Sequence, residues 1–347
     1  MPAPPPEHEL TSRSLRARDL GLLVGTLEPG AVNAITDVSG VRVGHTTILE
    51  PHGTYSGVTA VLPGALGPDR PLPAGMFVGN GYGKFVGATQ VRELGEIETP
   101  ILLTSTLSTF RVADALVTWV LRTSPRGIGS LNPVVGEVND SWLCGPGTRA
   151  VGPDHVWAAL DGATEGPVPM GSVGGGTGAC ALGFKSGIGS SSRRVRIRGE
   201  AGTVGVLVQA NMGGVLRLGG AEVTPDGLGL SHAGPASSEG SCVVVVAVDV
   251  PASARELERI AARGVFALGR VGAAFSHGSG DYALAFSTVR DVGVAMTAAE
   301  LDELFRAVLD GVEEAVIDAL LAATSVRTPS GRLAAALPQS VLKCRPG

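Results

Sequence analysis

The sequence predicts an α/β protein in which helices cover β-sheet on more than one side. Short runs rich in β-branched residues alternate with stretches of helical spacing along the first part of the chain. Residues 242–248 (CVVVVAV) form a continuous apolar run, which is typical of a strand buried on both faces of its sheet. Two segments with strong helix-start signals follow that run. A strand covered on both faces needs a layer above and a layer below it, so a layered α/β architecture is expected.

The first third of the chain predicts a terminal arm followed by alternating strands and helices. Residues 1–30 are rich in proline and then mixed in composition, which indicates an arm that packs on a neighbouring molecule, and the fold is expected to start near Ile35. Short runs bounded by glycine or proline predict strands, and apolar residues at helical spacing predict helices. The expected strands are 41–48, 58–62 and 101–103, and the expected helices are 84–94 and 111–121.

Glycine dominates the middle of the chain, where residues 171–189 predict a region of loops and strands. A dinucleotide-binding fingerprint at Gly174, Gly176 and Ala179 would need a strand immediately before it, and the preceding Gly-Pro-Val-Pro is a poor strand. A strand is expected at 204–210. The irregular residues 219–240 then predict an exposed linker, and a long irregular segment of this kind is usually functional or processed.

The regular pattern resumes abruptly at Ser241, the residue before the apolar run 242–248. Two capping boxes follow, each with a Ser or Thr three residues ahead of a Glu and an apolar helical repeat behind it. They are Ser253 with Glu256 and Thr297 with Glu300. Between the two predicted helices, residues 282–287 have the composition of another strand.

Composition excludes several classes of protein. Of the 347 residues, 44% are hydrophobic and 17% charged, so the chain can bury a large core. A net charge of −5 gives no electrostatic footprint for nucleic acid, and we interpret the cluster Arg193–Arg198 as a solvated edge. The N-terminus lacks the pattern of a signal peptide and no apolar run is long enough to span a membrane, so a cytoplasmic protein without a membrane partner is expected. Without CxxC or HxxxH spacing, no metal site is expected.

The dipeptide Gly240-Ser241 has the chemistry that cleavage of a chain by itself requires. Glycine leaves its carbonyl open and tolerates the backbone strain of attack, and the Ser241 hydroxyl lies one residue away. Attack gives an ester, and water then frees the α-amine of Ser241. Because an α-amine titrates at about pH 7.7 to 8.0, it can act as general base for its own hydroxyl. Alone, a glycine before a serine at a strand start indicates only a turn.

The sequence resembles the L-aminopeptidase/D-esterase family, which includes the β-peptidyl aminopeptidases. The resemblance runs from about residue 35 to 325 and is carried by motifs that occur in one order. These are ITDV at 35–38, GVRVGH at 40–45, GVTAV at 57–61, VND at 138–140, GGGT at 174–177, GFK at 183–185, GIG at 187–189, QAN at 209–211, Gly240-Ser241, and GSGDY at 278–282.

This resemblance implies a fold, a processing event and an activity. The fold would be a four-layer αββα sandwich of the N-terminal-nucleophile type, in a single domain over residues 1–347. The chain would be cut before Ser241 into chains 1–240 and 241–347, and the cleaved heterodimers would assemble into a homo-oligomer, a tetramer or larger. The activity would release N-terminal residues from small peptides, amides or esters through an acyl-enzyme, with no cofactor.

The resemblance also assigns roles to individual residues. Ser241 matches the nucleophile, Ser279 the serine that orients and activates it, and Asp281 the acidic group beside it. Ser279 and Asp281 lie two apart at a strand start, so their side chains are expected on one face.

Asn211 matches the asparagine of the oxyanion hole, although Asn211-Met212-Gly213-Gly214 is also the composition of a turn. Asn139, Asp140 and Trp142 match the substrate site, with Asp140 or Asp281 expected to hold the substrate ammonium. Trp142 stands where members of the family commonly have tyrosine. An indole has one N–H donor and no acidic hydroxyl, so substrate preference is expected to differ.

Two other functions are compatible with the sequence, and several other residues have the chemistry of a site. The chain could be an acyltransferase of the ornithine acetyltransferase type, which usually has a threonine nucleophile, or an uncleaved homologue without activity. His277, close to Ser279, suggests a Ser-His-acid triad but has no supporting motif. His45 is interpreted as a structural histidine at a strand end and Lys185 as a turn or subunit contact, with a place in the pocket lining as the alternative for either. Cys242 is interpreted as core on the face opposite to Ser241.

Overall fold

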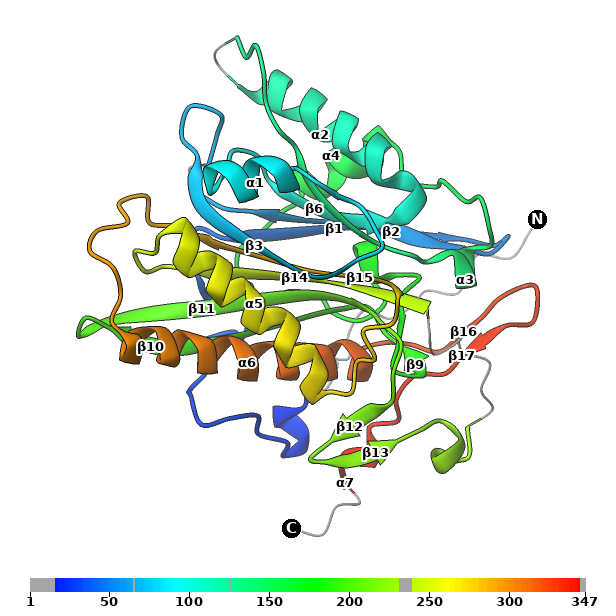
Figure 1. Cartoon of the computed structure of the whole chain (residues 1–347). Helices are drawn as coiled ribbons and strands as arrows, with labels where there is room; N and C mark the ends of the chain where they lie inside the picture. The colour runs from blue at the N-terminus through cyan, green and yellow to red at the C-terminus, as the bar shows by residue number, and fades with distance from the viewer. Residues whose placement is uncertain (1–15, 65, 125–126, 231–238, 344–347) are drawn as a thin grey trace.

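Two stacked β-sheets with helices on both outer faces form the molecule (Figure 1). The computed structural model describes residues 16–64, 66–124, 127–230 and 239–343. The first sheet has the strand order β1-β2-β6-β7-β4, and the second has the order β10-β11-β14-β15-β3-β5. Helices α2 and α4 pack on the outer face of the first sheet, and α5 and α6 on that of the second. The expected four-layer αββα architecture is confirmed.

The elements have the following bounds. The first sheet contains β1 (Arg42–Glu50), β2 (Thr54–Leu62), β4 (Phe85–Val86), β6 (Ile101–Ser105) and β7 (Val134–Val138). The second contains β3 (Leu72–Gly81), β5 (Glu96–Ile97), β10 (Ile188–Ile197), β11 (Glu200–Asn211), β14 (Glu239–Val248) and β15 (Gly278–Ser287). The helices are α1 (Ala88–Leu94), α2 (Thr109–Thr123), α3 (Ser141–Cys144), α4 (Pro153–Asp161), α5 (Ala254–Arg270), α6 (Ala298–Leu321) and α7 (Ser340–Lys343). The described residues also form three short hairpins: β8 (Cys180–Ala181) with β9 (Phe184–Lys185), β12 (Leu216–Leu218) with β13 (Ala221–Val223), and β16 (Val326–Arg327) with β17 (Leu333–Ala334).

Strand β14 is buried on both faces, as the apolar run predicts. Its side chains alternate, so that Val244 and Val246 pack toward α5 and α6 while Val243 and Val245 pack between the two sheets. On its two edges it pairs antiparallel with β11 and parallel with β15. At about 25 cal/mol per Å² of apolar surface, burial of both faces makes this strand a main source of hydrophobic stabilisation.

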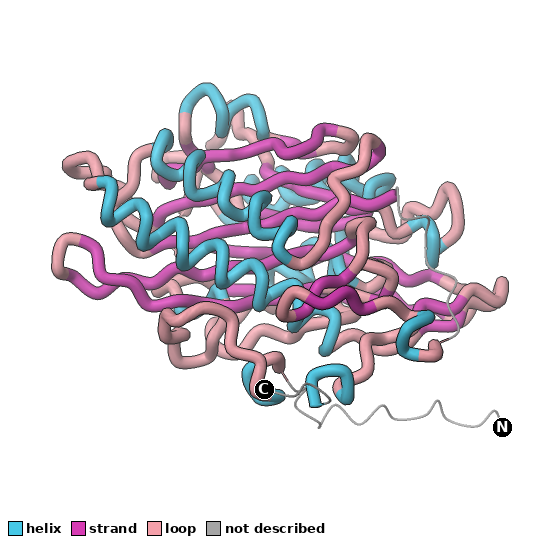
Figure 2. Tube along the Cα trace, turned by 60° about the horizontal axis from the view of Figure 1, so that its bottom comes forward, coloured by secondary structure: helices cyan, strands magenta, loops and turns pink. Residues whose placement is uncertain are grey.

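Helices α5 and α6 lie across the outer face of the second sheet (Figure 2). Both begin at the predicted capping boxes. The Ser253 amide donates to Glu256 Oε2 at 2.8 Å, and the Thr297 amide donates to Glu300 Oε2 at 2.8 Å. These bonds satisfy N–H groups that have no partner within the helix. The positions of the two helices relative to β14 and β15 therefore follow from signals in the sequence.

Two expectations for charged and terminal segments are wrong. Residues 16–34 pack on their own chain, since Arg16 pairs with Asp318 of α6 and the Ala17 side chain is buried; residues 1–15 lie outside the described part. Arg193 is fully buried and pairs with Glu314 at 2.6 Å. Alternation along β10 explains this, because Arg193 faces α6 while the neighbouring arginines of the cluster face solvent.

Two boundaries also differ from expectation. The predicted helix 84–94 begins only at Ala88, because Phe85 and Val86 pair with β7 as strand β4. The predicted linker 219–240 contains strand β13 and a 3-10 turn at Asp226–Leu228, and its residues 239 and 240 already belong to β14. Residues 231–238 of that linker lie outside the described residues.

His45 lies inside β1 rather than at its end. Its Nδ1 is 2.9 Å from Thr59 Oγ1 on β2, and burial lowers its pKa to about 4. The folded protein therefore resists protonation of a ring that the unfolded chain protonates at about pH 6.5.

We predict that this histidine makes folding less favourable as the pH falls through the window from about 6.5 to 4. At pH 5 the unfolded chain gains a proton at His45 that the native state does not, which lowers the free energy of unfolding by about 2 kcal/mol. Urea denaturation of wild type and His45→Gln at pH 7.5 and pH 5 measures the difference. An equal loss in both proteins would exclude His45 as its source.

Candidate active site

Ser241 is the third residue of the central buried strand β14, at a point where β14 pairs with β11 on one side and β15 on the other. Its Cα partner on β11 is Asn211, and its partner on β15 is Gly280. The Ser241 side chain is 4% exposed. Hydrogen-bonded neighbours on both sides hold the backbone here, so the geometry of this serine is set by the sheet and not by a loop.

The Ser241 hydroxyl is turned toward the peptide bond that precedes it. Oγ donates to the Gly240 carbonyl oxygen at 2.8 Å and accepts from the Gly280 amide at 3.2 Å. Gly240 is tightly enclosed, because a Cβ at this position would lie 2.5 Å from the Gly213 nitrogen and 2.6 Å from the Met212 Cα. Only glycine fits against this backbone without a shift of the chain.

Ser279 and Asp281 contact each other at the start of β15, as their spacing predicts. Ser279 Oγ donates to Asp281 Oδ1 at 2.8 Å. Asp281 is buried, and burial raises the pKa of its carboxyl group, opposed by the hydrogen bond from Ser279. The other oxygen, Oδ2, is buried and has no hydrogen-bond partner among the described residues.

The pleat places this pair and the Ser241 side chain on different faces of the sheet. Asp281 precedes Ala283, which packs toward α5, whereas Ser241 precedes Val243, which packs between the sheets. Ser279 is in register with Gly240. The pair is therefore placed beside the main chain of the Gly240-Ser241 junction, and the structure gives it no hydrogen bond to the Ser241 hydroxyl.

Asn80 on β3 holds the loop that leads into this pair. Its amide Nδ2 lies within hydrogen-bond distance of the carbonyl oxygens of Ser276 (2.9 Å), His277 (3.0 Å) and Ser279 (2.5 Å). One side chain thus contacts three carbonyl oxygens within residues 276–279, and it fixes the conformation of the segment before Gly280.

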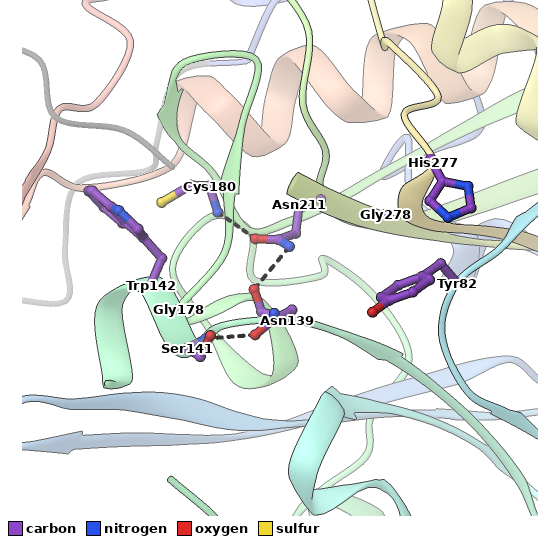
Figure 3. A pocket seen from close by; sticks show the side chains of 10 residues that line it. Tyr82, Asn139, Ser141, Trp142, Gly178, Cys180, Asn211, His277 and Gly278 are labelled. Atoms are coloured by element: carbon purple, nitrogen blue, oxygen red, sulfur yellow. Dashed lines mark hydrogen bonds between the residues drawn. The ribbon is translucent and has the colours of Figure 1, made fainter. Parts of the chain in front are cut away.

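Asn211, the last residue of β11, has a fixed amide orientation. The Cys180 backbone N–H, which can only donate, donates to Asn211 Oδ1 at 2.9 Å. Nδ2 then donates to the Asn139 carbonyl at 3.1 Å (Figure 3). An amide nitrogen has two N–H groups, so one remains for a ligand.

A pocket of about 440 Å³ opens beside this asparagine. Asn139, Ser141 and Trp142 line it from the segment after β7 (Figure 3), and Gly240 is also among its lining residues. The structure thus brings Asn139 and Trp142 to the pocket but not Asp140. The Asp140 carboxylate is buried in the wall, where its Oδ2 accepts from Ser56 Oγ at 2.7 Å, and burial raises its pKa to about 6.

Near the pocket, Tyr82 and Glu137 have no role predicted from the sequence, and His277 is suggested only as part of a Ser-His-acid triad. Tyr82 and His277 line the pocket, with ring centroids 6.1 Å apart (Figure 3). Glu137, two residues before Asn139, accepts from the Lys84 amide at 2.9 Å through Oε1, while its Oε2 is buried without a partner among the described residues. Glu137 could have been predicted from the sequence, because it is an acid near the end of a buried strand and directly precedes the polar VND motif.

In the described part of the chain, no group of three or more His, Cys, Asp or Glu side chains could hold a metal ion. No helix within those residues is both long and apolar enough to cross a bilayer.

A four-layer αββα fold with a buried serine at the start of a central strand defines a hydrolase with an N-terminal-nucleophile type of fold. The chain belongs to peptidase family S58, whose model matches residues 33–334. It is therefore a peptidase, and its relatives identify an aminopeptidase.

The relatives match almost the whole chain. The β-peptidyl aminopeptidase BapA of Sphingosinicella microcystinivorans is 37% identical over 361 aligned residues, which cover 94% of this chain and 91% of that protein. The structure of a Burkholderia sp. β-aminopeptidase is 37% identical, with a TM-score of 0.83 and coverage of 95% and 97%. The L-aminopeptidase D-Ala-esterase/amidase of Ochrobactrum anthropi is 35% identical, with a TM-score of 0.85 and coverage of 94% and 97%, and is described as a variant of the N-terminal-nucleophile hydrolase fold.

Proposed function

We propose that the chain cleaves itself between Gly240 and Ser241 and then uses Ser241 as the nucleophile of a serine aminopeptidase. The observation that carries this proposal is the 2.8 Å contact between Ser241 Oγ and the carbonyl oxygen of Gly240. Oγ attacks the Gly240 carbonyl carbon, the C–N bond breaks, and the hydroxyl proton passes to the departing amine. Water then hydrolyses the ester, which gives a Gly240 carboxylate and a free Ser241 α-amine.

The same serine acts on the substrate. The α-amine takes the proton from Oγ as it attacks the substrate carbonyl, and Asn211 donates to the oxyanion through its remaining N–H. Ser279 and Asp281 orient the α-amine. The register between Ser279 and Gly240 supports this role, as does Asp281 Oδ2, which has no hydrogen-bond partner in the part of the chain that the structure describes. Water then releases the acyl group, and no cofactor takes part.

The substrate ammonium needs a carboxylate, and the geometry favours Glu137 over Asp140. Asp140 is bound to Ser56 inside the wall. Glu137 pairs with Lys84 Nζ at 3.3 Å through Oε1, but its other oxygen is buried and has no partner among the described residues. A Cβ on Gly83 would lie 3.0 Å from Glu137 Oε1, which places the carboxylate next to the segment that includes the pocket residue Tyr82. Asp281 remains the second acid near the junction.

Small peptides, amides or esters with a free N-terminal amine are the proposed substrates. The pocket volume and the aromatic side chains of Trp142 and Tyr82, which line the pocket, suit a single N-terminal residue and its leaving group. A screen of aminoacyl p-nitroanilides and amides with α-, β- and D-configured residues distinguishes the preferences. The chain is also proposed to be made as a zymogen and to act in the cytoplasm. The cleaved protein is proposed to be a homo-oligomer, a tetramer or larger, and light scattering on it measures the oligomeric state.

The family and the relatives give no support to the acyltransferase alternative. The other alternative, an uncleaved homologue without activity, predicts that the wild-type chain stays intact on a denaturing gel.

On a denaturing gel, wild type is expected to give two bands, of 240 and 107 residues, and Ser241→Ala a single band of 347 residues. Gly240→Ala is expected to cleave more slowly, because its Cβ would lie 2.5 Å from the Gly213 nitrogen and move the junction. Gly129→Ala is the matched control, since nothing lies within 4 Å of a Cβ at that position. An intact wild-type chain after prolonged incubation would refute self-cleavage.

Asn211→Ala is expected to lower kcat by about 10²- to 10³-fold with little change in KM, because it removes a donor that acts on the transition state. Asn132→Ala, which removes an amide bound to Glu98 elsewhere, is the control. Steady-state kinetics per cleaved enzyme, with the cleaved fraction taken from the gel, measures both. A kcat within a factor of two of wild type would remove Asn211 from the oxyanion hole.

Glu137→Gln is expected to raise KM for an aminoacyl p-nitroanilide by about 10- to 100-fold, which corresponds to a hydrogen bond with a charged group. Glutamine keeps an oxygen for the Lys84 amide but loses the charge that pairs with Lys84 Nζ at 3.3 Å, so urea denaturation of the variant accompanies the kinetics. Glu93→Gln, at an exposed position of α1, serves as the control. An unchanged KM would assign the ammonium to another group.

A further inference from the structure

Lys185, on the short strand β9, has its ammonium group fully buried beside the active-site pocket. Nζ donates to the carbonyl oxygens of Ala179 at 2.8 Å and Ser186 at 2.5 Å, with Gly176 at 3.4 Å. Among the described residues no carboxylate accepts from it. A buried charge without an opposite charge is costly, so a purely structural clamp would be better made by a neutral donor.

The Ala179 carbonyl belongs to the same peptide group as the Cys180 N–H, which donates to Asn211 Oδ1 at 2.9 Å. The hydrogen bonds therefore form a continuous chain from the Lys185 ammonium, through the peptide between Ala179 and Cys180, to the side-chain amide of Asn211. Figure 3 shows the last link of this chain at the pocket wall.

We propose that Lys185 is a positioning residue that polarises Asn211 through the Ala179–Cys180 peptide and so strengthens the oxyanion hole. This inference rests on the proposed role of Asn211. When a carbonyl oxygen accepts from a cation, the N–H of the same amide becomes a stronger donor, and a second amide in series is polarised in the same direction. The end of the chain is the Asn211 N–H that faces the oxyanion.

The electrostatic surroundings of the ammonium fit this role. Burial lowers the Lys185 pKa to about 8, and the neighbouring titratable groups are the thiols of Cys180 and Cys144, whose pKa values burial raises to about 11 and above the usual range respectively. Asp140 lies on the other side of this loop, since a Cβ on Gly178 would be 2.7 Å from the Asp140 Cβ. With both thiols neutral, the positive charge acts on the loop without a paired thiolate.

Two substitutions separate charge from hydrogen bonding. Lys185→Met removes both, and Lys185→Gln removes the charge but keeps two N–H donors for the loop carbonyls. We expect each to lower kcat for an aminoacyl p-nitroanilide by about tenfold, with KM within about twofold, per cleaved enzyme. A role limited to holding the loop predicts instead that glutamine restores kcat, and that result would overturn the inference.

A double-mutant cycle tests the route through Asn211. In an Asn211→Ala background, Lys185→Gln is expected to change kcat by less than about twofold, because the group through which it acts is gone. The same tenfold loss in that background would refute the chain of polarised amides. If Asn211→Ala alone leaves kcat unchanged, the proposed function of Asn211 fails. If Asn211→Ala lowers kcat as expected but Lys185→Gln leaves kcat unchanged, only the role of Lys185 is overturned.

NMR of the Asn211 side-chain amide, in a protein that keeps Lys185, tests the proposal even if neither lysine variant folds. In uncleaved Ser241→Ala, labelled with ¹⁵N-asparagine, no Ser241 α-amine titrates. The Asn211 side-chain N–H resonances are expected to shift between pH 7 and 9 as Lys185 loses its proton, while those of Asn132 stay constant. Asn211 resonances that do not move across this range would contradict the proposal.

Discussion

The pairing of β14 on both edges and its burial on both faces is the constraint on which the rest of this structure depends. Backbone hydrogen bonds to β11 and β15 fix the start of the strand. The two apolar cores, one on each face of the second sheet, hold the strand in place from both sides. The Ser241 hydroxyl is thereby placed 2.8 Å from the Gly240 carbonyl oxygen, and the Gly240 Cα lies tightly against the main chain of Met212 and Gly213. Reactive geometry here follows from packing, because a sheet interior tolerates little rearrangement.

A second theme is that side chains organise the site by donating to main-chain carbonyls. Asn80 gathers the loop before Gly280, and Lys185 gathers the glycine-rich loop before Cys180. Gln209 does the same between the sheets, where its amide donates to Thr104 and Gly175. Loops rich in glycine have few side chains to pack, so buried donors supply the order that packing gives elsewhere.

Local signals in the sequence predicted the strands and capped helices well, because the β14 run and the capping boxes depend on neighbouring residues alone. Long-range partners could not be found this way. Arg193 belongs to a cluster that looks solvated until alternation along β10 turns it toward Glu314 on α6. Likewise Asp140 and Glu137 are both acids in one short segment, and only the packing of Ser56 and Lys84 against them distinguishes their surroundings. The resemblance, and not periodicity, supplied the candidate site residues.

The order of strands in the second sheet has a mechanical consequence. β15 and all but the first two residues of β14 come from the part of the chain after residue 240. They lie between β11 on one side and β3 on the other, both from the part before it. Arg16 and Arg18 add ion pairs from the opposite end of the chain to α6. Two polypeptides produced by a break at Gly240 would thus share one sheet, with strands of one between strands of the other. Neither could dissociate without breaking the backbone hydrogen bonds of that sheet.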